Sequence, residues 1–199
     1  MKIFIKILLV SIFYTAIHVY PARAADSPPT DEEIKQFLVA YKNTELASQP
    51  LWSTTRGKYA TQRTPSQIAY FSCLAEKVFP ASYEPAALAA SRELFGSSAQ
   101  LRELTVFYES VAGQKRQKRK IFAWQKPMNK AESERDDSYP SDLQFTDADQ
   151  ANIKLFESSP NALLAKTFWT RMSGIITQQS VELIKPGAPN QCGIYPNGR

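Results

Sequence analysis

The residue types that most often do chemistry in proteins are scarce in this chain. His18 is the only histidine, and it lies in a segment that we expect to be removed. Without it the chain lacks the commonest general base, the commonest zinc ligand and the histidine partner of a nucleophilic serine or cysteine. The seven glycines are scattered, and no G-x-S-x-G or glycine-rich phosphate motif occurs. The sequence therefore predicts no recognisable catalytic centre and no cofactor.

Carboxylates are the remaining candidates for acid–base chemistry. Two carboxylates suffice for glycoside cleavage, and four glutamates lie in predicted helices: Glu76, Glu93, Glu103 and Glu109. Any protein of this size offers such residues, so they define only an alternative function, a secreted effector or a carboxylate-dependent cell-wall hydrolase. No Asp-x-Asp-x-Asp-Gly calcium loop occurs, and we expect no metal site.

Cys73 and Cys192 are the only cysteines. In an oxidising compartment an even pair predicts a disulfide, which here would close a loop of more than a hundred residues and attach the C-terminal tail to an early helix. Prolines and glycines fill residues 186–199, so this tail cannot form a regular element. The alternative, a redox-active pair, lacks the Cys-x-x-Cys spacing.

The N-terminus has the pattern of an export signal. Lys2 and Lys6 precede an apolar run from Ile7 to Tyr20, and Ala22-Arg23-Ala24 supplies a small-x-small cleavage site. We therefore expect residues 1–24 to be a cleaved signal peptide. The alternative, an uncleaved anchor, needs a span of about 20 residues, longer than this run. The pattern favours the periplasm, with the medium as the alternative, and no stable membrane insertion after cleavage.

Removing the predicted signal also changes the charge. The full chain has a net charge of +5, but the signal holds three cations and no acid, so the mature chain falls to +2. The basic character is thus partly a property of the signal, and nucleic acid is not an expected partner. About 175 residues remain, enough for one core, and residues 25–185 are predicted to form a single domain.

Helical signals dominate this domain. Capping residues followed by apolar side chains at helical spacing predict an all-α bundle of about six helices. The predicted starts are Thr30, Thr64-Pro65, Pro85, Ser98, Thr146 and Ser159-Pro160. No sustained alternation predicts a sheet. Residues 125–144 are rich in charge and proline and poor in large apolar side chains, which predicts an exposed, mobile connection within the domain.

Residues Gln100–Lys115 resemble a motif of a bacterial exported all-helical family of unknown function. The family pattern is F-T-x-x-E-L-x-x-L-x-x-F-Y-x-S-P-x-G-x-K. The matching positions are Leu101, Leu104, Phe107, Tyr108, Ser110, Gly113 and Lys115, whereas the leading F-T, the glutamate and the proline are absent. The resemblance implies a helical fold and export. The family has no known activity, so no catalytic role transfers.

A second, partial copy of the motif lies 49 positions further on. It supplies the missing features in Phe145-Thr146 and Ser159-Pro160, and it keeps the apolar positions Ile153 and Phe156. The motif also has a purely structural interpretation. Leu101, Leu104, Phe107 and Val111 would form a buried stripe, Ser110 or Ser159 would cap the next turn, and Gly113 would permit close helix approach.

Two surfaces are candidates for binding a partner. The first is a basic segment of six cations around Phe122: Lys115, Arg116, Lys118, Arg119, Lys120 and Lys126. It could bind an anionic envelope component or an acidic protein, or it could be a solvated helix end that complements the helix dipole. Trp124 adds an aromatic side chain to this segment.

The second surface is the segment Pro50–Tyr59, which we predict to be a loop. It combines Trp52 and Tyr59 with two cations, a composition favoured at interfaces, although the two rings would serve equally well to cover the core. The sequence as a whole predicts an exported, non-catalytic protein that binds another macromolecule of the cell envelope, as an inhibitor, an immunity protein or an accessory of a secretion or envelope assembly.

Overall fold

Five of the six predicted helix starts are confirmed, and the sixth, at Pro85, is not. A computed structural model of the chain describes residues 27–56, 60–126, 130–185, 190–194 and 196. The predicted signal peptide and Tyr59 lie outside these ranges. Thr30 and Thr64 each form a capping box, with Glu33 and Gln67 respectively, and Pro65 occupies the first turn of its helix.

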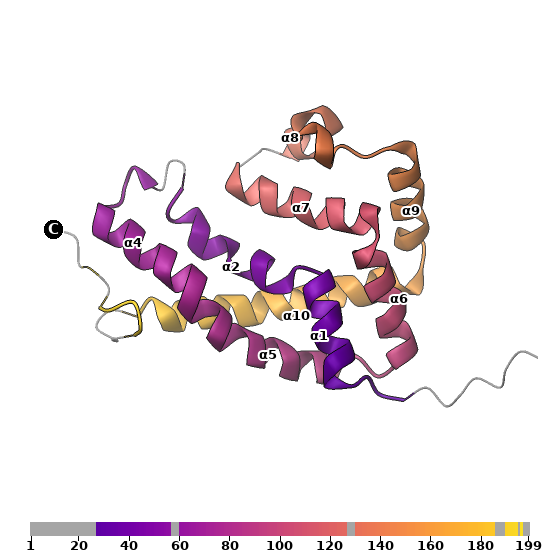
Figure 1. The fold of residues 1–199 in the computed structure, drawn as a ribbon, viewed down its shortest axis with the longest axis horizontal. Helices are drawn as coiled ribbons and strands as arrows, with labels where there is room; N and C mark the ends of the chain where they lie inside the picture. The colour runs from indigo at the N-terminus through magenta and orange to yellow at the C-terminus, as the bar shows by residue number, and fades with distance from the viewer. Residues whose placement is uncertain (1–26, 57–59, 127–129, 186–189, 195, 197–199) are drawn as a thin grey trace, which may run out of the picture.

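The described residues form helices and no strand, which confirms the all-α class and the single domain (Figure 1). The α-helices are α1 (Asp31–Ala40), α2 (Asn43–Ser53), α4 (Pro65–Cys73), α5 (Phe79–Leu94), α6 (Ser98–Glu109), α7 (Val111–Gln125), α8 (Lys130–Glu134), α9 (Asp147–Glu157) and α10 (Pro160–Leu183). A π-helical turn, η1 (Leu74–Val78), joins α4 to α5, and two 3-10 turns, η2 (Asp136–Ser138) and η3 (Ser141–Leu143), precede α9.

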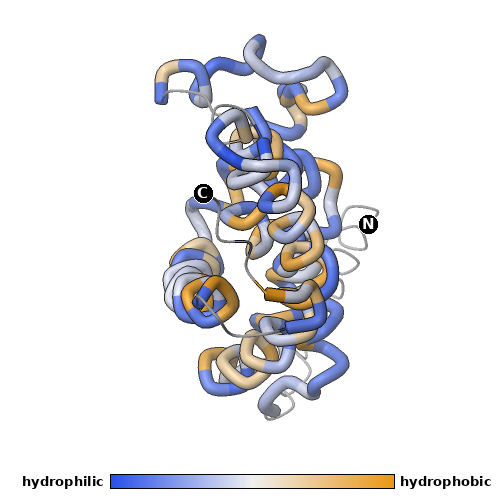
Figure 2. Tube along the Cα trace, turned by 90° about the vertical axis from the view of Figure 1, so that its left-hand side faces the viewer, coloured by the Kyte–Doolittle hydropathy of each residue, from blue (hydrophilic) through white to orange (hydrophobic). Residues whose placement is uncertain are grey.

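Aromatic side chains fill the centre of the bundle. Phe37 of α1 and Tyr41, which follows that helix, each lie with their ring centroids 5.0 Å from that of Phe168 of α10, and the ring centroid of Tyr108 of α6 lies 4.6 Å from that of Tyr41. Such tilted and edge-to-face pairs add to the stabilisation gained by removing apolar area from water. Apolar and polar stretches are mixed along each helix, as expected for amphipathic helices that surround a shared core (Figure 2). No helix among the described residues has the length and apolar character needed to cross a membrane.

Two predicted boundaries were wrong because prolines lie inside helices. Pro85 does not begin a helix but stands in the middle of α5, which starts at Phe79. The predicted loop at Pro50 belongs to α2 as far as Ser53. A proline inside a helix takes away the hydrogen bond to the carbonyl four residues earlier, and its ring crowds that carbonyl. A helix tolerates it where both groups have room, and Pro85 is exposed.

The two motif copies fold as two similar corners. Residues 97 and 146 stand immediately before α6 and α9, and residues 110 and 159 stand before α7 and α10. Phe107 and Phe156, at equivalent positions of the two copies, stack on each other with ring centroids 3.7 Å apart. The repeat spacing of 49 positions is therefore matched by the helix boundaries and by a direct contact between the copies.

The first corner depends on a serine and a glycine. Ser110 Oγ accepts a hydrogen bond from Gly113 N at 3.1 Å and caps α7, whereas Ser159 has no such capping bond. A Cβ at Gly113 would lie 2.1 Å from the carbonyl oxygen of Phe107, so only glycine fits this close approach. Val111, predicted to be buried, is exposed on the outer side of the corner.

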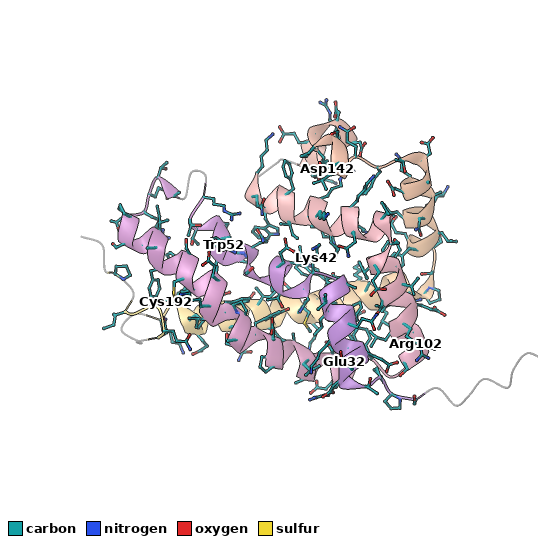
Figure 3. The ribbon with its side chains drawn as sticks, in the orientation of Figure 1. Glu32, Lys42, Trp52, Arg102, Asp142 and Cys192 are labelled. Carbon is teal, nitrogen blue, oxygen red and sulfur yellow. A yellow bond between two sulfur atoms is a disulfide. The ribbon has the colours of Figure 1, made fainter. Side chains whose placement is uncertain are left out.

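Residues 125–144 are not exposed throughout, which corrects the prediction for the part of this segment that the structure describes. The segment contains α8 and the two 3-10 turns, and it buries Tyr139 and Leu143. Although the segment has few apolar residues, these two suffice to hold it against α7. Figure 3 shows it above α7, with Asp142 labelled.

The C-terminal tail is tied to α4. Cys73 and Cys192 form the predicted disulfide across 119 positions, with their Cα atoms 5.8 Å apart. Asn190 Nδ2 donates to the Tyr70 hydroxyl at 2.8 Å, and Gly193 takes a positive φ of 91° in the turn that follows the cysteine. A cross-link and a few hydrogen bonds hold this part of the tail, which has no helical packing of its own.

Candidate functional site

The structure disperses the predicted basic segment. Three of its six cations form ion pairs with acids from later elements of the fold. Lys115 Nζ lies 2.7 Å from Asp149 of α9, and Arg116 Nη2 lies 2.8 Å from Glu157 at the end of the same helix. Hydrogen bonds from Lys115 and Thr146 hold the pKa of the buried Asp149 carboxyl below its usual range. These pairs fasten α9 to α7.

Arg119 is the most deeply buried of the six. Its guanidinium carbon lies 3.7 Å from the ring centroid of Tyr139 and 4.1 Å from that of Phe145, and Nη1 donates to Asp136. The Asp136 carboxylate also accepts from Phe145 N at 3.0 Å. Arg119 is thus the centre around which residues 136–145 fold, and it is not available to a partner.

The other three cations remain at the surface. Lys118 and Lys126 are exposed and form no ion pair with a described residue. Lys120 is more than one third exposed, with its ammonium 5.6 Å from the Tyr41 ring centroid. Partial desolvation and the positive charge of Arg116 lower the pKa of Lys120 to about 8. The segment therefore leaves three separate cations and no continuous basic face.

The predicted interface aromatics that the structure describes differ in their burial. Trp52 packs against the core, and the guanidinium carbon of Arg56 lies 4.8 Å from its ring centroid. Trp124 is exposed near the end of α7. Tyr59 lies outside the described residues.

Two neighbouring hollows at the surface of α1 form a site that the sequence did not indicate. The larger, of about 780 Å³, lies between α1, the start of α2 and α5, and its walls include Leu38, Pro85 and Leu88. The smaller, of about 550 Å³, lies between α1 and the α6–α7 corner, where Glu109 and Gln114 line it. The larger hollow has a mainly apolar surface and a volume typical of ligand sites, whereas the smaller one is lined mostly by polar and charged side chains.

Lys35, Val39 and Lys42 border both hollows, and we call these three residues the lysine stripe. They follow one another along α1 and into its junction with α2. Val39 is 78 % exposed, the highest value among the large apolar side chains that the structure describes. Lys35 forms no ion pair with a described residue, in contrast to the buried cations of α7.

A sharp bend fixes the far end of the stripe. Lys42 is the one described residue other than glycine with a positive φ, 55°, and it separates α1 from α2 (Figure 3). Two glutamines of α7 hold the carbonyls at the end of α1. Gln114 Nε2 donates to Ala40 O at 2.8 Å, and Gln117 Nε2 donates to Tyr41 O at 2.7 Å. A left-handed conformation costs a lysine about 1–2 kcal/mol, and this one is kept by its surroundings.

The other side of the bend is braced by α5. The Tyr83 hydroxyl donates to Asn43 Oδ1 at 3.1 Å in the interior, where burial raises the pKa of Tyr83 and keeps the hydroxyl protonated. At the rim of the larger hollow, Thr44 Oγ1 donates to Glu84 Oε1 at 3.2 Å. The hollow is therefore preformed, with lysines on its α1 edge and a carboxylate on its α5 edge.

Three of the four candidate carboxylates contact other helices, and the fourth, Glu76, is exposed. Glu93 pairs with Arg171 at 3.0 Å, Glu103 accepts from Asn161 at 2.7 Å, and Glu109 accepts from Gln36 at 3.1 Å. Each of these contacts lies at the surface and joins the glutamate to a helix other than its own. Within the described part of the chain, no group of three or more His, Cys, Asp or Glu side chains could hold a metal ion.

A sequence signal for the site exists, but it is weak. Lys35, Val39 and Lys42 lie four and three positions apart, the spacing of one helix face, and Val39 stands where an exposed helix face would normally be polar. The walls supplied by α5 come from residues more than 40 positions away, and no local pattern announces them. Comparison with known proteins finds no family model, no curated protein and no solved structure that matches this chain.

Proposed function

We propose that this chain is an exported protein that binds another macromolecule of the cell envelope through the lysine stripe and the two hollows beside it. The observation that carries the proposal is the exposed Val39 between two lysines, at the shared border of a mainly apolar hollow and a more polar one. A partner that covers Val39 and the apolar wall of the larger hollow removes their surface from water, which favours binding.

Two features support the envelope as the compartment. The N-terminal sequence has the charge, apolar run and cleavage pattern of a signal peptide. The Cys73–Cys192 disulfide belongs to the class of cross-links that persist in oxidising compartments such as the periplasm.

The test is capture of the partner from the source cells. The chain is expressed with its own leader and a C-terminal tag, purified in its oxidised form from the envelope fraction, and the proteins bound to it are quantified by mass spectrometry. We expect Val39→Glu to reduce the captured partner at least tenfold, because the charged side chain opposes desolvation of the stripe.

Leu155→Glu is the matched control. Leu155 is 74 % exposed on α9, so the substitution makes the same change of polarity at a similar exposure. It should leave capture unchanged, and circular dichroism should show the same helix content for both variants. Undiminished capture by the folded Val39→Glu variant would contradict the proposal.

A further inference from the structure

Helix α10 has an outer face that the rest of the fold leaves uncovered. Its inner face buries Phe168 and Met172, and α1 lies on that inner side, where Phe37 contacts Phe168 (Figure 1). The outer face consists of exposed residues alternately four and three positions apart: Leu163, Thr167, Thr170, Gly174, Thr177, Val181 and Ile184. This is the spacing by which one helix packs along another.

A hollow of about 380 Å³ lies on the first half of this face. It is lined by Leu163, Lys166, Thr167, Thr170 and Arg171. The first four of these residues have the spacing of the four that surround an inserted side chain when two helices pack as knobs into holes. The surface of the hollow is mainly apolar, and Arg171 is already paired with Glu93 at 3.0 Å. The hollow therefore favours an apolar side chain from a facing helix.

The polar groups of the outer face are satisfied within α10. The hydroxyls of Thr167, Thr170 and Thr177 donate to the carbonyls four residues earlier, at 3.0, 3.1 and 2.9 Å. Covering the face would leave none of these three hydroxyl hydrogens without an acceptor. Residues 172–181 include no charged residue, so a second chain can cover the centre of the face without removing a charge from water.

Gly174 lies in the middle of this face. A Cβ there would meet nothing within 4 Å, so packing within the chain does not require a glycine at this position. Glycine inside a helix costs about 1 kcal/mol relative to alanine. The absence of a side chain lets the backbone of a second helix approach closely at this point.

Val181 has the position and chemistry to fill the hollow of a second copy. Its apolar side chain is 52 % exposed, and it lies seven positions after Gly174, as Thr167 of the hollow lies seven positions before it. A two-fold axis at Gly174 therefore places Val181 of each copy over the hollow of the other in an antiparallel pair. A parallel pair would set Lys166 against Lys166 and hollow against hollow.

We infer that two copies of this protein associate through the outer faces of α10, antiparallel about a two-fold axis at Gly174. Val181 of each copy enters the hollow of the other, and Leu163 lies level with Ile184 of the second copy. The contact extends over roughly 30 Å of helix, at the small end for specific interfaces, so the dimer forms reversibly with concentration. The inference concerns a different surface from the lysine stripe and does not depend on the proposed function.

The first test is sedimentation velocity of the oxidised protein over a hundredfold range of concentration. The wild type should pass from monomer to dimer. Val181→Glu should weaken the dimer at least tenfold, because it directs a carboxylate into each apolar hollow. Val106→Glu is the matched control, since Val106 is 68 % exposed on α6, and this variant should dimerise as the wild type does. Circular dichroism compares the helix content of both variants.

The second test is cysteine cross-linking, which does not depend on breaking the interface. The two native cysteines are bonded to each other, so an introduced cysteine is the one free thiol. Gly174→Cys should form a disulfide between chains, because residues on the axis face each other within the Cα separation of about 7 Å that the bond needs. Thr167→Cys lies on the same face but about 21 Å from its counterpart, and it should not cross-link.

Sedimentation of the wild type as a monomer at every concentration would overturn the inference, as would a dimer that Val181→Glu leaves unchanged. Equal cross-linking of Gly174→Cys and Thr167→Cys would indicate a parallel pair and would also contradict it. A monomeric wild type that loses an envelope partner in Val181→Glu would assign the outer face of α10 to another protein instead.

Discussion

Helices α1 and α7 both carry lysines on amphipathic faces, yet the fold uses them in opposite ways. On α7, Lys115 and Arg119 point toward acids and aromatic rings of later segments and hold those segments in place. On α1, Lys35 has no such partner and lies beside the exposed Val39 at the border of two hollows. The helix with more cations, α7, uses them to hold the fold together.

The difference teaches that the number of cations in a segment does not identify a binding surface. What matters is whether the fold places an acidic side chain from another segment next to these cations. Asp136, Asp149 and Glu157 lie 17 to 41 positions after their α7 partners and come back to that helix. No described acid forms an ion pair with Lys35, although its positive charge acts on Asp31 one turn earlier and Glu109 of α6 lines the same hollow.

The largest effect is expected at Arg119. We predict that Arg119→Ala lowers the free energy of unfolding by about 2–3 kcal/mol, because it removes a buried guanidinium that packs on Tyr139 and Phe145 and pairs with the partly exposed Asp136. The measurement is urea unfolding followed by circular dichroism, with hydrogen exchange of residues 136–145 as the local readout.

Arg119→Lys separates charge from shape. It keeps the positive charge but loses the planar group that lies against Tyr139 and Phe145, so we expect an intermediate loss of about 1–2 kcal/mol. If Arg119→Ala were as stable as the wild type, the structural role given to α7 would be wrong.

A smaller effect with a pH signature is expected at Asp149. Since Lys115 and Thr146 lower the folded pKa of this carboxyl, its stabilisation is fully present above the pKa of an unfolded aspartate, about 3.9, and is lost as the pH falls through the folded value. Asp149→Asn should cost about 2 kcal/mol at pH 7. The difference from the wild type should shrink at pH 3, and a constant difference would mean that charge is not what matters there.

The smallest effects on stability are expected at the exposed lysines. Lys35→Glu and Lys118→Glu should each change the free energy of unfolding by less than about 0.5 kcal/mol, because neither side chain has an ion-pair partner among the described residues. Thermal unfolding of the two variants tests this. A large loss in Lys35→Glu would show that the stripe is part of the internal framework, as the cations of α7 are.

Much of the fold was predictable because its signals are local. Thr30, Thr64 and Thr146 cap helices within three residues of themselves, and the single cysteine pair left one possible disulfide. The boundaries that failed were those at Pro50 and Pro85, where tertiary packing tolerates a proline inside a helix.

The candidate site was less predictable because its features are not local. The basic segment was visible as a run of charge, but its neutralisation by Asp136 and Asp149 depends on how the chain returns to α7. The lysine stripe is a site only because α5 stands opposite α1 and because Gln114 and Gln117 hold the bend at Lys42. The spacing of residues within α1 indicates neither the position of α5 nor the hydrogen bonds from α7.

The central claim, that the partner binds α1 and not the basic segment, is tested most directly by capture with two charge-matched variants. Lys35→Glu/Lys42→Glu and Lys118→Glu/Lys126→Glu change the net charge equally; Lys35, Lys118 and Lys126 are exposed, and the Lys42 side chain is 24 % exposed. We predict that the first variant loses the partner captured from the envelope fraction at least tenfold and that the second retains it. Retention by the first and loss by the second would contradict the account and return the function to α7.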